Sequence, residues 1–553
     1  MRARHVFLES LRLHGVSHLF GNPGTTESPL LDTLRDYPEI GYVTALHEGV
    51  AVTAAHYYAQ ASGETGVANV HVAPGLGNGL GSLYGVLRAR SPLILTAGAQ
   101  DTRMRTREPM LGHDLVAMAR PLVKWSAQVE HADEMAAIMA RAFKIAQEPP
   151  CGPVFVALPI NVMEQETAVG AWRAGLLHGL PEAPAAGLQQ MAQCLAQAQH
   201  PAIVCGDELA GAGAVGGVVR LAESLGAAVF HEGLRQHLSF PNRHPHCNGA
   251  LPFEAAGIRA ALTPFDVVLL IGGPFFEEIW FDPGSAIPDQ TQLLQLSATH
   301  DTVARNFPVA VGTVGALAPA LDTLVATLDE MTMNSTAAAA RGAQLTAATA
   351  ARRAAMDAAV QVQAAQVPMT SAVALREIAA AVPPDTIVVD ESITALGDVA
   401  HAFDLREAGD YFGPRGGGIG QGIAGALGVK VAQPRRPVVC VSGDGSAMYH
   451  IQALWTAARL SRGIVFVILN NNEYRVLKHN LDAYRQRFDA QSNAGYPYMD
   501  IGPELDFVGL ARGMGVAATA IEDWQDLQAC VVAALASGQP HLIEVRVAGK
   551  DNA

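Results

Sequence analysis

Short runs of apolar residues alternate with segments of helical periodicity along almost the whole chain. Continuous apolar runs of this length are typical of strands that are buried on both faces, as in a parallel sheet. Helical segments between such strands act as crossovers that return the chain to the same edge of the sheet. The pattern therefore predicts an α/β fold with parallel sheets. It places strands at residues 41–45, 66–71, 92–97, 153–158, 201–205, 266–271, 386–390, 437–441 and 464–469.

Two stretches interrupt this alternation. Residues 165–187 contain Gly, Pro and Ala without a clear period, and residues 333–366 are rich in Ala and polar side chains. Both are typical of connectors between domains, and the second is expected to be helical. We therefore expect a first domain at 1–165, a middle domain at 185–330, a linker at 331–366 and a last domain at 367–553.

Composition and charge exclude several classes of protein. Half of the 553 residues are hydrophobic and 16% are charged, which argues against intrinsic disorder. The 37 Lys and Arg against 52 Asp and Glu give a net charge of −15 (37 − 52), which does not suit a nucleic-acid binder. No apolar run is long enough to span a membrane, and residues 1–7 lack the apolar core of a signal peptide. The six cysteines are scattered, which favours reduced thiols and a cytoplasmic protein.

The strongest chemical signal lies at the ends of two expected strands. One strand leads into Gly443-Asp444-Gly445-Ser446, and the next, one helix later, leads into Asn470-Asn471. The spacing from Asp444 to Asn471 is 27 residues (471 − 444), one β-α-β crossover, so both side chains are expected at the same carboxyl edge of a sheet. A carboxylate and an amide oxygen suit a hard cation such as Mg²⁺, which characteristically bridges protein oxygens to phosphates. The glycines let backbone amides approach a diphosphate.

At these residues the sequence resembles the thiamine diphosphate enzymes, whose signature is Gly-Asp-Gly followed by Asn-Asn about one crossover later. The resemblance covers nearly the whole chain and is strongest to the benzoylformate decarboxylases, within the wider group of 2-oxo-acid decarboxylases and acetolactate synthases. The matching stretches are residues 20–27, 46–49, 69–75, 120–125, 282–284 and 452–458. The resemblance implies a pyrimidine-binding first domain, a Rossmann-like middle domain and a diphosphate-binding last domain, with thiamine diphosphate and Mg²⁺ as cofactors.

The resemblance also implies which residues hold the cofactor. Glu48 would bond to the pyrimidine ring and promote the loss of a proton from the cofactor, and the carbonyl of Gly417 would accept from the aminopyrimidine. Ile419 would hold the cofactor bent. The metal would take Asp444, Asn471 and the backbone carbonyl of Glu473. The remaining residues expected to bind the cofactor are Thr394, Gly443, Gly445 and Ser446.

A second group of residues is expected around the substrate. His71 matches an active-site histidine at a strand end, and a histidine can donate or relay protons at neutral pH. Thr25 matches a serine that binds the substrate carboxylate, so Glu48, His71 and Thr25 are the expected catalytic residues. The expected substrate pocket consists of Thr25, His71, His113, Ile279, Val476, Leu477 and Asn480.

The sequence departs from the benzoylformate decarboxylases on the substrate side. Ile279 stands where those enzymes have a second catalytic histidine, and isoleucine cannot transfer a proton. Asn480 replaces an aromatic pocket residue, and Val476 replaces a small one. The nearby basic residues either bind an anionic substrate or form a solvated helix face; they are Arg475, Lys478, His479 and Arg485.

Two glycine-rich stretches are similar to dinucleotide fingerprints. Residues 420–425 fit Gly-x-Gly-x-x-Gly but do not follow a strand, so we interpret them as a loop under the cofactor. Residues 211–216 do follow a strand, and Glu232 lies 21 positions after Gly211 (232 − 211). Because four residues separate Gly206 from Gly211, the turn is not tight. We favour a Rossmann-like middle domain, and whether it binds a nucleotide stays open.

These features lead to three functional hypotheses. The leading one is a carbon–carbon lyase, a thiamine diphosphate- and Mg²⁺-dependent decarboxylase that converts a 2-oxo acid into an aldehyde without oxidation. The second is an acetolactate synthase-like carboligase, which the missing proton donor at Ile279 favours. The third is a nucleotide-binding oxidoreductase or a non-catalytic binding module. A bound flavin would favour the carboligase or the oxidoreductase, but FAD is not the expected cofactor.

The resemblance finally implies an oligomer. Glu48 and Asp444 lie in different expected domains and must reach one cofactor. In the resembling enzymes they come from different subunits, so we expect a homodimer or homotetramer with active sites at the interface.

Overall fold

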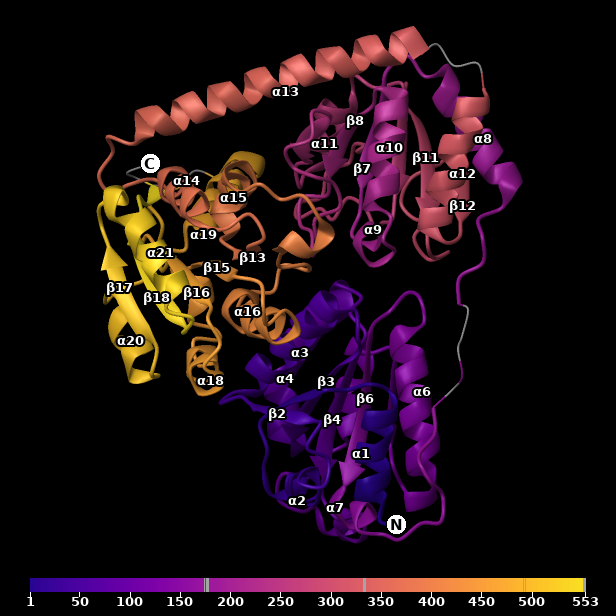
Figure 1. Ribbon diagram of the computed structural model, residues 1–553, viewed down its shortest axis with the longest axis vertical. Coiled ribbons are helices and arrows are strands. Elements are labelled where there is room, and N and C mark those ends of the chain that lie inside the picture. The colour runs from indigo at the N-terminus through magenta and orange to yellow at the C-terminus, as the bar shows by residue number, and fades with distance from the viewer. Residues whose placement is uncertain (174, 176–178, 332–334, 491, 493, 551–553) are drawn as a thin grey trace. The chain divides into compact units, whose positions relative to one another are not determined.

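Three parallel sheets of six strands each follow one another along the chain (Figure 1). The computed structural model describes residues 1–173, 175, 179–331, 335–490, 492 and 494–550. The predicted α/β fold class is confirmed, and each strand predicted from an apolar run is present within two residues of its expected ends. Parts of the two expected connectors (174, 176–178 and 332–334) and the end of the last domain (551–553) lie outside the described residues.

The first sheet has the strand order β2-β1-β3-β4-β6-β5. Its central strands β3 and β4 are buried along nearly their whole length, because α1 and α6 cover one face and α3 and α4 the other (Figure 1). The strands are β1 (His18–Gly21), β2 (Gly41–Thr44), β3 (Gly66–His71), β4 (Leu93–Ala99), β5 (Trp125–Gln128) and β6 (Pro153–Pro159). The helices are α1 (Ala3–Leu13), α2 (Ser28–Leu34), α3 (Glu48–Ser62), α4 (Val72–Arg88), α5 (Leu115–Ala119), α6 (Met135–Gln147) and α7 (Ile160–Met163).

The second sheet has the order β12-β11-β10-β7-β8-β9, which is that of a doubly wound nucleotide-binding fold. Its strands are β7 (Pro201–Cys205), β8 (Ala228–His231), β9 (Cys247–Ala250), β10 (Val267–Ile271), β11 (Gln292–Ser297) and β12 (Val311–Val314). Its helices are α8 (Ala185–Gln197), α9 (Glu208–Gly211), α10 (Val215–Leu225), α11 (Ala255–Leu262) and α12 (Leu317–Glu330). The long helix α13 (Ser335–Gln363) follows within the stretch expected to be a linker.

The strand order of this sheet reverses between β7 and β10, where such folds bind their ligands. Here the loops after these two strands are packed on one another, since a Cβ on Gly206 would lie 2.2 Å from the carbonyl oxygen of Gly272. The carboxylate of Glu232 accepts the backbone N–H of Phe276 at 3.1 and 3.2 Å. Glu232 is thus part of the loop packing, whereas a dinucleotide fingerprint would need it for a ribose.

The third sheet has the order β14-β13-β15-β16-β18-β17. Its strands are β13 (Ile387–Glu391), β14 (Tyr411–Phe412), β15 (Val438–Gly443), β16 (Val465–Asn470), β17 (Ala517–Ile521) and β18 (His541–Arg546). Its helices are α14 (Ser371–Ala381), α15 (Leu396–Ala402), α16 (Gln421–Ala432), α17 (Asp444–Ala447), α18 (Ala453–Leu460), α19 (Arg475–Arg487), α20 (Phe507–Gly513) and α21 (Leu527–Ala536).

The chain divides into two compact units. The first comprises Met1–Leu177, Ala364–Val399 and Pro414–Ala553, and the second comprises His178–Gln363 and Ala400–Gly413. The first unit therefore holds the first sheet and most of the third.

Within the first unit, α16 packs tightly on α3 through its glycines. A Cβ on Gly428 would lie 2.0 Å from the carbonyl oxygen of Ala54, and one on Gly425 would lie 2.8 Å from the ring of Tyr57. The interpretation of residues 420–425 as a loop is wrong beyond Gly420, because α16 begins at Gln421. These glycines are needed because two helix backbones approach one another here.

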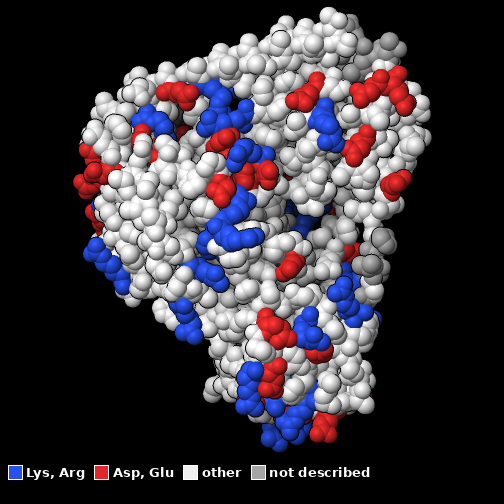
Figure 2. Space-filling view, in the orientation of Figure 1, with Lys and Arg blue, Asp and Glu red and all other residues white. Residues whose placement is uncertain are grey.

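The face of the molecule drawn in Figure 2 carries few charges. On the face drawn in Figure 2, uncharged residues cover most of the area, and Lys and Arg are interspersed with Asp and Glu. Among the described helices, none is long and apolar enough to cross a membrane.

Candidate active site

The ends of β15 and β16 bring Asp444 and Asn471 together, as their spacing predicts. The two strands are parallel neighbours with Gly443 paired to Leu469, so the next residues of each emerge at one edge of the sheet. The carboxylate of Asp444 accepts the backbone N–H of Asn471 at 3.1 Å and that of Asn472 at 2.7 Å. Its other oxygen accepts the N–H of Gly445 at 2.7 Å. Backbone amides thus orient the Asp444 carboxylate.

The surroundings of Asp444 suit a cation. The side chain is buried, with 4% of the residue exposed, and this burial raises the pKa of Asp444 to about 6 although several backbone N–H groups oppose the shift. A buried carboxylate without a cationic partner is costly, and a bound cation would offset that cost. The described residues contain no cluster of three His, Cys, Asp or Glu that would suit zinc. The available donors are instead carboxylate, amide and carbonyl oxygens, which fit Mg²⁺.

One cavity collects most of the residues expected to hold the diphosphate and its metal. Its lining includes Thr394, Gly443, Asp444, Gly445, Ser446, Asn471 and Glu473. Arg475 and Val476, from the first turn of α19, line the same cavity. A side chain at Gly445 would not fit, because its Cβ would lie 2.6 Å from the ring of Tyr474. The ring of Tyr474 therefore closes the cavity against the Gly445 backbone.

The loop before α16 is shaped by glycines and by a buried carboxylate. Gly417 and Gly420 have φ values of +75° and +92°, which L side chains rarely adopt. The carboxylate of Glu391, at the end of β13, accepts the N–H groups of Gln421 and Gly422, each at 2.7 Å. It thereby caps the N-terminus of α16 and fixes the loop that carries Gly417 and Ile419.

Glu48 begins α3, where the ring of His47 caps the helix by accepting the N–H of Gly49 at 3.0 Å. The Glu48 carboxylate faces α4: it accepts from the amide of Asn78 at 3.0 Å, and a Cβ on Gly75 would lie 2.9 Å from its oxygen. Glu48 is not among the described residues that line the Asp444 cavity.

His71 ends β3 and is held by a residue that the sequence interpretation missed. Its Nδ1 lies 2.7 Å from the carboxylate of Glu27 and 3.1 Å from the hydroxyl of Thr26. Glu27 is 2% exposed and also accepts the N–H groups of Gly24 (2.9 Å) and Gly98 (2.8 Å). A hydrogen bond at Nδ1 leaves Nε2 as the nitrogen available for a ligand.

Comparison with known proteins gives this arrangement its context. Domain descriptions match in chain order: the N-terminal TPP binding domain of thiamine pyrophosphate enzymes over residues 1–118, their central domain over 188–324 and their C-terminal TPP binding domain over 394–545. A benzoylformate decarboxylase of Pseudomonas aeruginosa is 34% identical, with 97% of each chain covered. The chain belongs to the thiamine pyrophosphate enzymes.

Two further known proteins show how widely the similarity extends. The acetolactate synthase large subunit of Parasynechococcus marenigrum is 26% identical over 99% of this chain and 87% of its own. A solved structure, the thiamine diphosphate-dependent 4-hydroxybenzoylformate decarboxylase of Rhodococcus jostii, superposes with a TM-score of 0.86 at 29% identity, covering both chains completely. Decarboxylases and acetolactate synthases thus both resemble this chain.

In this thiamine pyrophosphate enzyme, the residues expected around the substrate lie on several elements. Thr25 is exposed, and the exposed His113 lines a cavity of about 780 Å³ that also includes Val72, the neighbour of His71. Val476 lines the Asp444 cavity, whereas Leu477 is 43% exposed, and Asn480 lies one turn further along α19. Ile279 belongs to the second compact unit and is 61% exposed.

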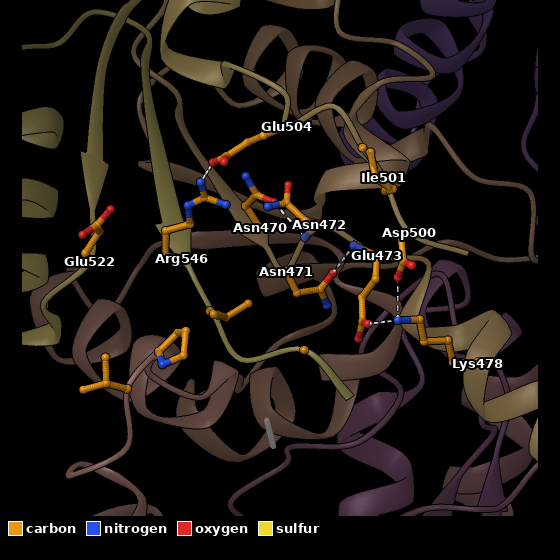
Figure 3. A pocket seen from close by; sticks show the side chains of 15 residues that line it. Asn470, Asn471, Asn472, Glu473, Lys478, Asp500, Ile501, Glu504, Glu522 and Arg546 are labelled. Atoms are coloured by element: carbon orange, nitrogen blue, oxygen red, sulfur yellow. Dashed lines mark hydrogen bonds and ion pairs between the residues drawn. The ribbon is translucent and has the colours of Figure 1, made fainter. Parts of the chain in front are cut away.

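The side-chain carboxylate of Glu473 is bound by residues of the protein itself. Figure 3 shows it pointing toward Lys478, with which it forms an ion pair, and Lys478 also pairs with Asp500 at 2.8 Å. The backbone N–H of Lys550 donates to the other Glu473 oxygen. The backbone N–H of Glu473 donates to the side-chain oxygen of Asn471 at 3.1 Å. Asn471 therefore orients the backbone of Glu473 and not its carboxylate.

Proposed function

We propose that this enzyme is a thiamine diphosphate- and Mg²⁺-dependent decarboxylase of a 2-oxo acid, which consumes one proton and releases CO₂ and an aldehyde. The observation that carries the proposal is the buried Asp444 carboxylate, held beside Asn471 in a cavity lined by Thr394 and Ser446. Such a set of oxygen donors matches what a metal-bridged diphosphate requires. The similarity to benzoylformate decarboxylases over the whole chain supports it.

Each group of residues has its own task in the proposed enzyme. Asp444, Asn471 and the Glu473 carbonyl would hold the metal, and Gly443, Gly445, Ser446 and Thr394 would hold the diphosphate. Glu48 would bond to the pyrimidine ring, the Gly417 carbonyl would accept from its amino group, and Ile419 would hold the cofactor bent. When bound, thiamine diphosphate would supply a nucleophilic carbon and an electron sink.

His71 and Thr25 act on the substrate in this proposal. Because Glu27 occupies Nδ1 of His71, Nε2 is the atom that delivers the proton that aldehyde release requires. The hydroxyl of Thr25 binds the carboxylate that becomes CO₂. His113, Ile279, Val476, Leu477 and Asn480 would complete the pocket.

Asp444→Ala tests the cofactor assignment. The variant should lose Mg²⁺-dependent binding of thiamine diphosphate in calorimetry, since the diphosphate loses its metal bridge. Asp322→Ala, which removes an exposed carboxylate paired with Arg220 in the second unit, is the control and should bind normally. Unchanged cofactor affinity in Asp444→Ala would refute the proposal.

We further propose that the active sites form between subunits of a homodimer or homotetramer, because Glu48 does not line the Asp444 cavity of its own chain. Mixing Glu48→Gln chains with Asp444→Ala chains tests this. If Glu48 acts on the partner's cofactor, a mixed dimer has one site free of both changes, so random mixing restores about a quarter of the normal activity. If each site lies within one chain, every site keeps a defect and no activity returns.

The carboligase remains the second candidate, favoured by Ile279, which cannot donate a proton where the benzoylformate decarboxylases carry a histidine. Identifying the products from a panel of 2-oxo acids separates the two activities. Ile279→His should raise aldehyde release relative to carboligation if proton delivery limits decarboxylation. An unchanged product ratio would mean that Ile279 does not control the outcome.

A further inference from the structure

Arg475 is a basic residue that lines the Asp444 cavity. It is the first residue of α19 and lines the cavity together with Val476, the position expected to face the substrate. The helix α19 packs against the short helix η5 (Ile393–Ala395), which carries Thr394. Arg475 therefore lies where ligands of the proposed active site would bind.

The guanidinium of Arg475 is poorly satisfied by the protein. Its Nη1 donates to the carbonyl of Ala548 at 3.4 Å, a long contact, and its Nε is buried without a hydrogen-bond partner. Among the described residues, no carboxylate forms an ion pair with it. A buried donor without a partner costs free energy, and Arg normally meets carboxylate or phosphate in such places.

The neighbouring cation is different. Lys478, one turn further along α19, is neutralised by Glu473 and Asp500. Arg475 lies at the positive end of the α19 helix dipole, where a cation is unfavourable. The first turn of α19 contains no acidic residue that would offset this repulsion. An arginine that is unfavourable for the helix and has no carboxylate partner among the described residues is explained by an anionic ligand.

We propose that Arg475 binds a second anionic group of the substrate, so that the preferred substrates are 2-oxo acids with a distal carboxylate. The inference rests on the proposed function and narrows its substrate class. Among the residues that the structure describes, the polar contact of the Arg475 side chain is with Ala548, beyond the end of β18, and none joins it to residues 443–446, whose amides would take the diphosphate. Its neighbour in the first turn of α19, Val476, is the position expected to face the substrate, which favours the substrate over the cofactor as the partner of Arg475.

Matched substrates test the proposal on the holoenzyme. 2-Oxoglutarate and 2-oxopentanoate have the same chain length and differ in the distal carboxylate. The wild-type enzyme should have the higher kcat/KM for 2-oxoglutarate, and Arg475→Gln should lower the ratio of the two values by about 10- to 100-fold, the effect of losing a charge-assisted hydrogen bond. Arg475→Lys should restore part of the ratio, because it keeps the charge but not the forked geometry.

One control variant and three outcomes separate this inference from its alternatives. Arg487→Gln removes an exposed charge from the last turn of the same helix and should leave the ratio unchanged. If Arg475→Gln weakens thiamine diphosphate binding without changing the ratio, the guanidinium serves the diphosphate and the proposal is overturned. A wild-type preference for 2-oxopentanoate also overturns it. If cofactor-loaded wild-type enzyme converts neither acid, nor pyruvate, nor benzoylformate, the proposed function itself fails.

Discussion

Glu391→Gln should change how the stability of the apoprotein depends on pH. Glu391 is completely buried, and its carboxylate accepts two N–H groups at the start of α16. Burial raises the pKa of Glu391 from 4.5 to about 7, although these backbone hydrogen bonds oppose the shift. The fold therefore favours the protonated side chain, and in the unfolded chain the same group ionises at lower pH.

The sign and size of the effect follow from these two values. The stability contributed by Glu391 is fully present below pH 4.5 and is lost as the pH rises to about 7. At about 1.4 kcal/mol per pH unit, the loss amounts to about 3 kcal/mol. Glutamine does not titrate, so the stability of the variant should not fall over this pH range. Because its amide has one oxygen in place of two, the variant should lose one hydrogen bond to a backbone N–H, at a cost that does not depend on pH.

Calorimetric unfolding of the apoprotein between pH 4.5 and 8 measures the difference. The wild-type midpoint should fall by several degrees relative to Glu391→Gln over this range. Glu39→Gln, at an exposed glutamate, should follow the wild type. Parallel curves for the wild type and Glu391→Gln would refute the assignment of the titration to Glu391.

Three further predictions concern other parts of the site. Glu27→Gln should lower kcat by about 100-fold while thiamine diphosphate still binds, because the amide cannot hold His71 in the same tautomer; an unchanged kcat would contradict this. Gly445→Ala should destabilise the apoprotein by about 1–3 kcal/mol through its clash with Tyr474, whereas Gly443→Ala has open space and should not; equal unfolding midpoints would count against the packing argument. Lys478→Met should cost about 3–5 kcal/mol by leaving the Glu473 carboxylate without its cation, and adding Glu473→Gln should recover part of the loss in a double-mutant cycle.

The residues at the ends of adjacent strands could be predicted from the sequence. Asp444 and Asn471 follow two apolar runs separated by one crossover, and parallel pairing of those runs decides that they meet. Glu27 was missed although the same reasoning applies, since β1 and β3 are neighbours in the first sheet and Gly21 pairs with Asn69. Glu27 lies several residues beyond the end of β1, and only the path of the intervening turn brings it to His71.

Glycines were harder to interpret, because one residue type serves several purposes. In residues 420–428, Gly420 provides a left-handed backbone conformation, whereas Gly425 and Gly428 let α16 approach α3. The pattern Gly-x-Gly-x-x-Gly includes both uses, and its spacing does not distinguish them. A glycine motif therefore indicates that the backbone is approached closely or has an unusual conformation. It does not tell whether the neighbouring group is a cofactor or another helix.

The two halves of the site differ in what fixes their residues. Asp444, Asn471 and Ser446 belong to two adjacent strand ends and one helix start of a single sheet, so strand pairing alone determines their arrangement. The residues expected around the substrate come from the first sheet, from α19 and from the second unit, and no single register links them. A substitution at Arg475 or Ile279 can therefore alter the substrate while the oxygens proposed to bind the metal stay in place. For this reason the sequence predicts the cofactor more directly than the substrate. The substrate class is instead inferred from Arg475, which has no carboxylate partner among the described residues.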